Sequence, residues 1–175
     1  MINYDHSYDD MLDSHRTGEL VNMSSNPNAG ILARHIVAEN AHDLAATLAT
    51  LHRDCVFTDH ATGQRWYGHA GASAHYNDHW AAFDVEVVRA EGQISLWSGE
   101  EIYVAQAVWR GTHIGDFMGI APTGRHFEHP FTVFVRFCDG LMQSEEFFYD
   151  LASLMATLGE QRLPELAHLP HRTTE

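Results

Sequence analysis

The spacing of apolar residues along the chain changes near residue 84. Between Ile31 and Leu51, apolar side chains recur three and four positions apart, which predicts helix. The pattern breaks at Asn40–Asp43, so we expect two helices, with Asp43 capping or charge-complementing the start of the second. A third helix is expected over Gly71–Phe83, where aromatic residues recur at helical spacing.

Beyond residue 84, apolar and polar residues alternate, which predicts β-strands. Three long strands are expected over Ile102–Thr112, Phe127–Cys138 and Leu141–Tyr149, in addition to a short early strand at Cys55–Phe57. Asp139-Gly140 between the last two strands is a strong hairpin signal.

A short helix over Leu151–Leu158 should follow the last strand, with Asp150 as its N-cap and Gly159 ending it. Helices come first and a meander of strands follows, which favours an α+β fold. We expect a cone: a curved antiparallel sheet wrapped over about three N-terminal helices, a shape that can enclose a small-molecule pocket.

The domain organisation expected is one domain over residues 30–160, since 175 residues suit a single core. Residues 1–29 are polar and form an N-terminal arm, in which a short helix over Tyr8–Leu20 is conceivable. Residues 161–175 form a polar C-terminal tail.

The composition argues against several classes of partner. The net charge is −14, and the chain has ten arginines and no lysine, so nucleic acid and anionic membrane surfaces are poor partners. We find no apolar run long enough to span a bilayer and no secretory signal, and we expect a cytoplasmic protein. Cys55 and Cys138 are expected to be reduced, buried thiols.

The segment Trp109–Gly159 contains a series of motifs in a fixed order. After a strand with Trp109 come GTHIG (residues 111–115) and the turn MGIAPTGR (residues 118–125), and then a strand that ends in Asp139-Gly140. In these motifs the chain resembles the SnoaL-like polyketide (ester) cyclase family, of the nuclear-transport-factor-2-like superfamily. The resemblance covers roughly residues 31–160.

The resemblance implies a homodimer in which each subunit encloses a hydrophobic cavity. It also implies catalysis without a metal or organic cofactor, by an acidic residue on the last strand that takes a proton next to a carbonyl group. In this sequence the position of that acid is occupied by Phe147, and the position of the family's histidine on the preceding strand by Val133. Aldol cyclisation by the family machinery is therefore not implied for this chain.

Glu145 is the first candidate for an acid/base in this chain. Alternate residues of a strand share a face, so Glu145, Phe147 and Tyr149 lie together, and we expect Phe147 to face the cavity. A carboxyl group beside aromatic rings in an apolar cone has its ionised form disfavoured, which suits proton transfer. The alternative is a solvated or dimer-interface residue.

His113, within the GTHIG motif, is the second candidate, because it could donate a hydrogen bond to a carbonyl or shuttle a proton. The alternative, which the flanking glycines favour, is a histidine that fixes the turn before Pro122-Thr123-Gly124. Asp59 and His60 follow the first strand and could act as an oriented base, although adjacent residues of a strand point apart.

Aromatic residues are expected to shape the pocket or the core: Trp80, Trp109, Phe117, Phe147 and Tyr67, together with Val133. His75 and His79 share one helix face and could bind a metal, but a third ligand at fixed spacing is missing, so a polar helix face is the preferred interpretation.

These observations lead to two hypotheses. The first is a cofactor-independent cyclase, isomerase or lyase that acts on a hydrophobic small molecule by acid/base chemistry. The second is a non-catalytic domain that binds a small molecule or another protein on the same fold, which the loss of the family's acid favours.

Overall fold

The computed structural model describes residues 26–162 as four helices and seven strands. Helices α2 (Ala29–Asn40), α3 (Leu44–Leu48) and α4 (Gly68–Ala82) come early, and α5 (Leu151–Leu158) closes the described chain. The helix considered over Tyr8–Leu20 lies outside the described residues. Within them, no helix is long and apolar enough to cross a membrane.

The break between α2 and α3 lies where the apolar pattern predicts it. A carboxylate oxygen of Asp43 accepts a hydrogen bond from the backbone nitrogen of Ala46 at 3.0 Å, which satisfies one of the free donors at the start of α3. The same capping occurs in α5, where Asp150 accepts from the nitrogen of Ser153 at 3.2 Å and Gly159 ends the helix with φ +100°. Both predicted caps are confirmed.

The strands form one curved sheet in the order β2-β1-β7-β6-β5-β3, and β4 also pairs with β5. Early in the chain lie β1 (Leu51–Asp59), β2 (Gln64–Tyr67), β3 (Phe83–Val88) and β4 (Ser95–Ser98). The long strands are β5 (Ile102–His113), β6 (His126–Cys138) and β7 (Leu141–Tyr149). Asp139 and Gly140 join β6 to β7 with positive φ angles of 53° and 73°, as the hairpin signal predicts.

The sheet differs from the prediction in one pairing. It is not purely antiparallel, because β1 runs parallel to β7, with Phe57 opposite Glu145 and Asp59 opposite Phe147. Neighbouring parallel strands need a long crossover connection, and here residues 60–140 provide it. The expectation of a wholly antiparallel sheet, which rested on the alternating strands of the second half, is thereby corrected.

Local boundaries also differ in the first half. The strand expected at Cys55–Phe57 extends over nine residues as β1, and β2, for which the sequence had not predicted a strand, pairs with it antiparallel. Helix α4 starts at Gly68, three residues before the predicted start, and Phe83 leaves the helix to begin β3.

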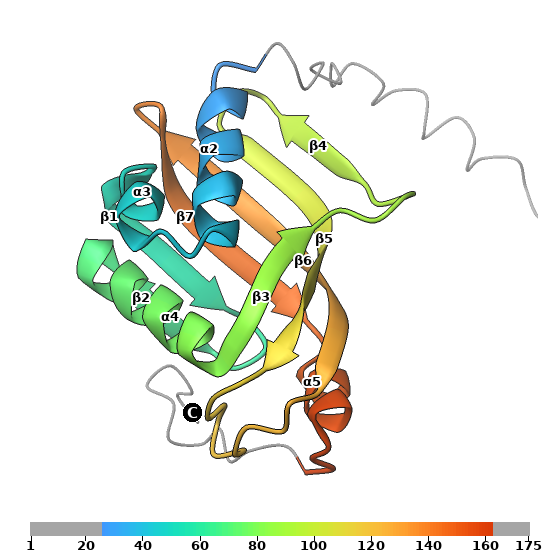
Figure 1. The fold of residues 1–175 in the computed structure, drawn as a ribbon. Coiled ribbons are helices and arrows are strands. Elements are labelled where there is room, and N and C mark those ends of the chain that lie inside the picture. The colour runs from blue at the N-terminus through green and yellow to red at the C-terminus, as the bar shows by residue number, and fades with distance from the viewer. Residues whose placement is uncertain (1–25, 163–175) are drawn as a thin grey trace, which may run out of the picture.

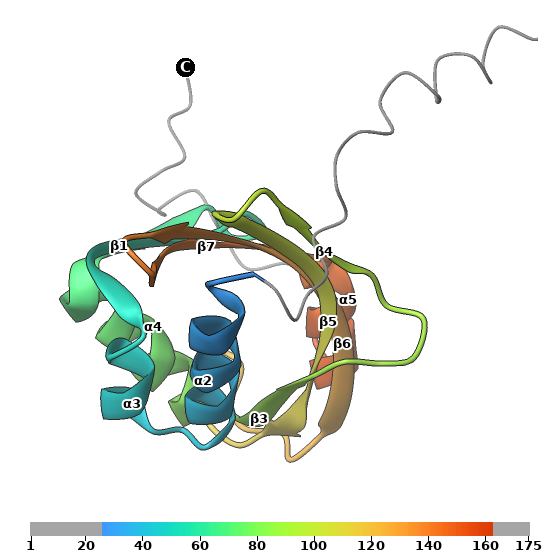
Figure 2. The same ribbon diagram turned by 90° about the horizontal axis from the view of Figure 1, so that it is seen from above.

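The sheet wraps around the helices, which gives the expected cone (Figures 1 and 2). Helices α2, α3 and α4 lie on its concave side, whereas α5 lies near the ends of β5 and β6. The core fills the space between α2, α4 and the inner face of the sheet. Its inward side chains include Phe57, Tyr76, Phe83, Val135 and Met142, all almost fully buried.

Candidate functional site

A cavity of about 470 Å³ opens between α4, β3, the end of β1 and the loop that joins β5 to β6. Its volume is within the range of small-molecule sites. Aromatic and imidazole rings form much of the wall: Trp66, His75, His79, Phe83, Trp109, Phe117, Phe147 and Tyr149. We call this space the main cavity.

The rings of the main cavity pack against one another. The ring centroids of Phe83 and Phe117 lie 4.8 Å apart, and those of Trp109 and Tyr149 lie 5.0 Å apart. The ring of His75 stacks on Phe147 at 5.5 Å, with an interplanar angle of 16°. Each ring therefore has its position fixed by a neighbour, which favours a preformed binding surface.

Asp59 and Tyr149 form a polar pair on this wall. The Tyr149 hydroxyl donates to Oδ2 of Asp59 at 2.8 Å, and Oδ1 accepts from the backbone nitrogens of Ala61 and Thr62 at 2.8 and 3.0 Å. The last strand is thereby joined to the turn after β1. Burial and the neighbouring Asp59 carboxylate raise the pKa of Tyr149 well above its ordinary value, so the phenol keeps its proton.

His75 and His79 both reach the main cavity from α4, one turn apart. Burial lowers the pKa of His75 to about 3 and that of His79 to about 4, with smaller contributions from neighbouring histidines. Both imidazoles are therefore neutral near pH 7. Neither forms a hydrogen bond to any residue within 26–162, so their ring nitrogens can bond to a ligand. No group of three or more potential metal ligands occurs in that range.

A second, smaller cavity of about 50 Å³ lies deeper, between α2 and the sheet. Glu145 and Val133 line this inner cavity. Glu39, Trp109 and Phe147 border both cavities and so separate them. Glu145 is therefore deeper on the same wall as Phe147, with only 7% of its surface exposed.

Glu145 lies at one end of a buried chain of hydrogen bonds. The Tyr76 hydroxyl is 3.4 Å from Oε2 of Glu145 and 3.0 Å from Nε2 of His35. On its other side, Nδ1 of His35 is 2.6 Å from the hydroxyl of Thr50, which in turn donates to the carbonyl oxygen of Thr47 at 2.6 Å.

The direction of these bonds follows from the number of protons. The Thr50 hydroxyl has a single proton, which goes to Thr47, so Nδ1 of His35 must be the donor to Thr50. Burial lowers the pKa of His35 to about 4, so the ring is neutral and its Nε2 accepts from Tyr76. The Tyr76 hydroxyl donates to Oε2 when Glu145 is ionised, and its oxygen can accept a hydrogen bond from Glu145 when that carboxyl group is protonated.

A protonated Glu145 agrees with its surroundings. Burial, and to a lesser extent the charge of Glu39, raise the pKa of Glu145 well above its ordinary value, and the Tyr76 hydrogen bond opposes this only weakly. Every group from Glu145 to Thr50 is then neutral and hydrogen-bonded, as a buried network requires.

Glu39 connects this chain to the main cavity. Its Oε2 lies 3.9 Å from Nε2 of His35, and Oε1 of Glu145 lies 3.8 Å from the same nitrogen. Burial raises the pKa of Glu39 to about 7. A carboxyl group that titrates near neutral pH and faces a cavity is suited to both giving and taking a proton.

The structure brings most of the predicted site residues to the two cavities. Asp59, Trp109, Phe117 and Phe147 line the main cavity, and Glu145 and Val133 line the inner one. Val133 and Phe147 also pair directly across β6 and β7. The two positions at which the resemblance implied an acid and a histidine are thus neighbours, and both carry apolar side chains here.

His113 is fully buried but borders neither cavity. Its Nδ1 lies 3.0 Å from the hydroxyl of Thr123 and 3.3 Å from the backbone nitrogen of that residue, and its ring packs on Phe83. The backbone of His113 also bonds to Gly124 and Arg125. These contacts match the alternative interpretation, a histidine that fixes the turn.

Three other predicted residues also lie away from the cavities. His60 is exposed, bonds to Glu146 at 2.9 Å and stacks on Phe148, so it points to the opposite face from Asp59. Tyr67 at the end of β2 is 58% exposed. Trp80, on α4, stacks between Tyr76 and His42 and lines neither cavity.

Several polar groups of the site were not predicted from the sequence. Glu39 and His35 lie four residues apart on a helix that was recognised only by its apolar positions. Tyr76 is one of the aromatic residues whose spacing predicted α4, and it contributes the hydroxyl that connects His35 to Glu145. The i, i+4 spacing of His35 and Glu39 was the one signal that could have indicated them.

A family model described as SnoaL-like polyketide cyclase matches residues 31–158. The chain belongs to the SnoaL-like polyketide cyclase family. The match covers the cone, both cavities and α5, and it confirms the resemblance inferred from the motifs. A search of the curated proteins returned no match.

Solved structures of similar proteins show the same fold. A proposed polyketide cyclase from Xanthomonas campestris pv. campestris is 20% identical, with a TM-score of 0.67 over 75% of this chain and 96% of that one. IdmH, a proposed polyketide cyclase from Streptomyces antibioticus, is 25% identical, with a TM-score of 0.63 over 75% and 98%. A protein with a ketosteroid isomerase-like fold from Catenulispora acidiphila, in complex with trimethylamine, is 23% identical, with a TM-score of 0.62 over 74% of this chain and 92% of that one.

Proposed function

We propose that this SnoaL-like protein is a cofactor-independent cyclase, isomerase or lyase that moves a proton on a hydrophobic small molecule. The observation that carries the proposal is the position of Glu39, which borders the main cavity and also approaches His35 at the buried hydrogen-bond chain of Glu145. Membership of the family supports a small-molecule cyclase type of function.

In the proposed reaction, the Glu39 carboxylate takes a proton from a carbon next to a substrate carbonyl. The electron pair of the broken C–H bond moves toward the carbonyl oxygen, which becomes an enolate. Neutral His75 or His79 can donate a hydrogen bond to that oxygen from the same cavity. Where the enolate is conjugated with a C=C double bond, return of the proton from Glu39 to the far carbon of that system completes an isomerisation. In a cyclisation, the enolate carbon bonds to the carbon of a second carbonyl group, and the alkoxide that results takes the proton from Glu39, which restores its carboxylate.

Glu145 has a supporting role in this proposal rather than the direct role expected from the sequence. It lies behind Phe147 and holds its proton, within reach of the nitrogen of His35 that Glu39 also approaches. The chain through Tyr76 and His35 can therefore adjust the proton affinity of Glu39 without contacting the substrate.

The first test needs no knowledge of the natural substrate. We would follow exchange of the α-hydrogens of 2-tetralone for deuterium in D₂O by proton NMR, with and without the protein. The wild-type protein should exceed the buffer rate, and Glu39→Gln should lower the protein-dependent rate by about 100-fold or more. Glu145→Gln should lower it less, because an amide can still donate to Tyr76 but cannot take up a proton.

A matched control is Glu128→Gln, which removes an exposed carboxylate that pairs with Arg110 at 2.7 Å on the surface. It should leave exchange unchanged. If a series of ring-fused ketones binds in the main cavity and none exchanges faster than in buffer, the acid/base proposal is wrong. The non-catalytic binding domain, which the apolar Phe147 at the family's acid position favours, would then be the better description.

Two further expectations belong to this proposal, a homodimer and a cytoplasmic location. Apolar side chains on the outer face of the sheet support the first, since Phe148 is 39% exposed and packs edge-on against Phe134. Light scattering after size-exclusion chromatography should give a mass of two chains, and Phe148→Glu should reduce it to one. A wild-type mass of one chain would contradict the homodimer.

A further inference from the structure

The charges around the main cavity are all of one sign. Four carboxyl groups from different elements border it: Glu39 from α2, Asp59 from β1, Asp78 from α4 and Asp116 from the loop after β5. No lysine or arginine of the described residues lines it. The other titratable groups on its wall are His75, His79 and the Tyr149 phenol, none of which is positively charged near pH 7.

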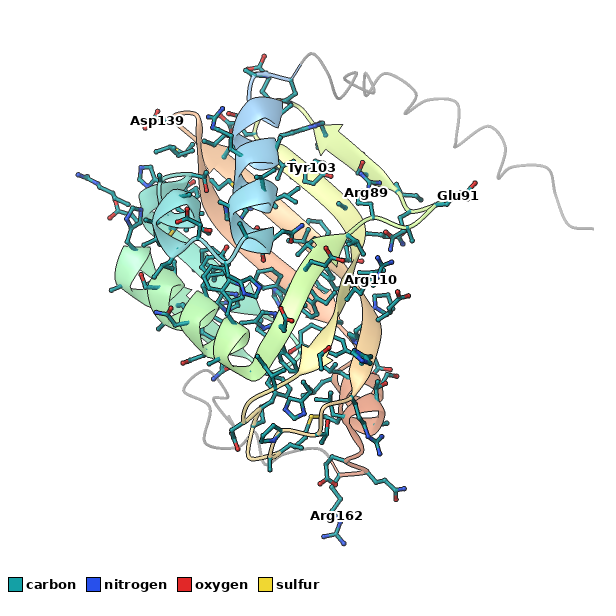
Figure 3. The ribbon with its side chains drawn as sticks, in the orientation of Figure 1. Arg89, Glu91, Tyr103, Arg110, Asp139 and Arg162 are labelled. Carbon is teal, nitrogen blue, oxygen red and sulfur yellow. The ribbon has the colours of Figure 1, made fainter. Side chains whose placement is uncertain are left out.

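The arginines lie elsewhere. Arg89 borders only the inner cavity, and its guanidinium donates to the Gln93 carbonyl and the Ser95 hydroxyl. Arg110 pairs with Glu86 and Glu128 at the surface. In Figure 3 both lie on the β3–β5 side of the molecule, away from α4. A carboxylate or phosphate ligand in the main cavity would therefore lose its hydration without gaining a cationic partner.

The aromatic rings of the wall favour a positively charged ligand. The faces of Trp, Tyr and Phe rings attract a cation through their quadrupole, most strongly where water is excluded. Trp66, Trp109, Tyr149, Phe83, Phe117 and Phe147 supply such rings around one enclosed space. This is an observation independent of the carboxyl groups, and both favour the same ligand charge.

We propose that the main cavity takes a ligand with a cationic nitrogen, a protonated or quaternary amine, attached to a hydrophobic body. The aromatic rings would surround the nitrogen substituents, and the rim carboxylates would supply the counter-charge. The inference shares its cavity with the proposed function, but it concerns binding and does not require turnover. It also predicts that a bound cation favours the ionised form of Glu39, the form that accepts a proton.

Three benzyl compounds separate charge from size, because the cation and the neutral compound have nearly the same shape. Benzyltrimethylammonium is the cation, neopentylbenzene its neutral isostere, and phenylacetate the anion. Binding is measured by ligand-observed NMR at pH 7. The cation should bind about tenfold or more tighter than the neutral isostere, and phenylacetate should be the weakest. Affinity for the cation alone should rise between pH 6 and pH 8, as Glu39 loses its proton.

Asp78→Asn and Asp116→Asn test the contribution of the rim. Both residues are exposed, so both variants should fold. Each should weaken binding of the cation by about threefold and leave the affinity for the neutral isostere unchanged. Glu128→Gln, which removes a carboxylate of the same charge outside the cavity, should change neither affinity.

Several results would overturn the inference: equal or tighter binding of the neutral isostere, tighter binding of phenylacetate, or no binding of the cation at millimolar concentration. The two proposals can fail separately. Selective cation binding without any ketone exchange contradicts only the acid/base function, whereas ketone exchange without cation preference contradicts only this inference.

Discussion

The hydroxyl of Tyr149 donates a hydrogen bond of 2.8 Å to Asp59, two residues that are 90 positions apart in the chain. Removing that hydroxyl by Tyr149→Phe leaves one oxygen of a buried carboxylate without its donor. We expect a loss of about 1–3 kcal/mol in the free energy of unfolding, measured by urea denaturation. Tyr67→Phe, which removes an exposed hydroxyl, should stay within about 0.5 kcal/mol of the wild type.

The buried carboxyl groups should make the protein less stable as pH rises. The pKa of Glu145 is raised from an ordinary 4.5, so the folded state binds this proton more tightly than the unfolded state. Its stabilising effect is complete below pH 4.5 and is lost progressively above it, by at most about 1.4 kcal/mol per pH unit. Glu145→Gln should therefore gain stability relative to wild type between pH 5 and pH 8, measured by thermal denaturation. A difference that does not change with pH would contradict this.

The buried histidines should destabilise the protein in acid. The pKa values of His35, His75 and His79 lie at about 4, 3 and 4, below the ordinary 6.5, so below pH 6.5 the unfolded state binds more protons. The contribution of these histidines to stability should fall as pH decreases from 6.5 toward 4, opposite in sign to the contribution of Glu145. His75→Leu should make this fall less steep in urea denaturation at pH 5 and pH 7. His126→Leu, at an exposed position, should leave the slope unchanged.

Gly115 allows the loop after β5 to approach the end of α4. A Cβ atom at this position would lie 2.0 Å from the carbonyl oxygen of Ala81, so Gly115→Ala must displace the loop that carries Asp116 and Phe117. We expect a loss of about 1–3 kcal/mol in stability and weaker ligand binding in the main cavity, measured by denaturation and ligand-observed NMR. Gly30→Ala, where the nearest atom is 3.7 Å away, should be neutral or slightly stabilising.

The sequence predicted the periodic features of the fold well, because each depends on residues close in the chain. The capping role of Asp43, the hairpin at Asp139 and the end of α5 at Gly159 all have local causes. The parallel pairing of β1 with β7 has no local cause in the sequence, since it depends on which strands meet when the chain folds.

The site was predictable to the extent that it follows the alternation of β7. That alternation placed Glu145, Phe147 and Tyr149 on one inward face, and the structure puts all three at a cavity wall. It could not show that Glu39 approaches the His35 nitrogen near Glu145 from a helix more than 100 positions earlier. His60 was misplaced for a simpler reason: it follows an inward residue and so points outward.

The pairing of β1 with β7 also has a consequence for the order in which the molecule is made. A chain emerging from the ribosome has Asp59, His75 and His79 long before residues 141–149 can close the sheet against β1. Until the last strand is in place, neither Phe147 nor Tyr149 is present to complete the wall. The main cavity is therefore a late product of biosynthesis, and a chain that stops before β7 would lack Phe147 and Tyr149 and could not complete this wall.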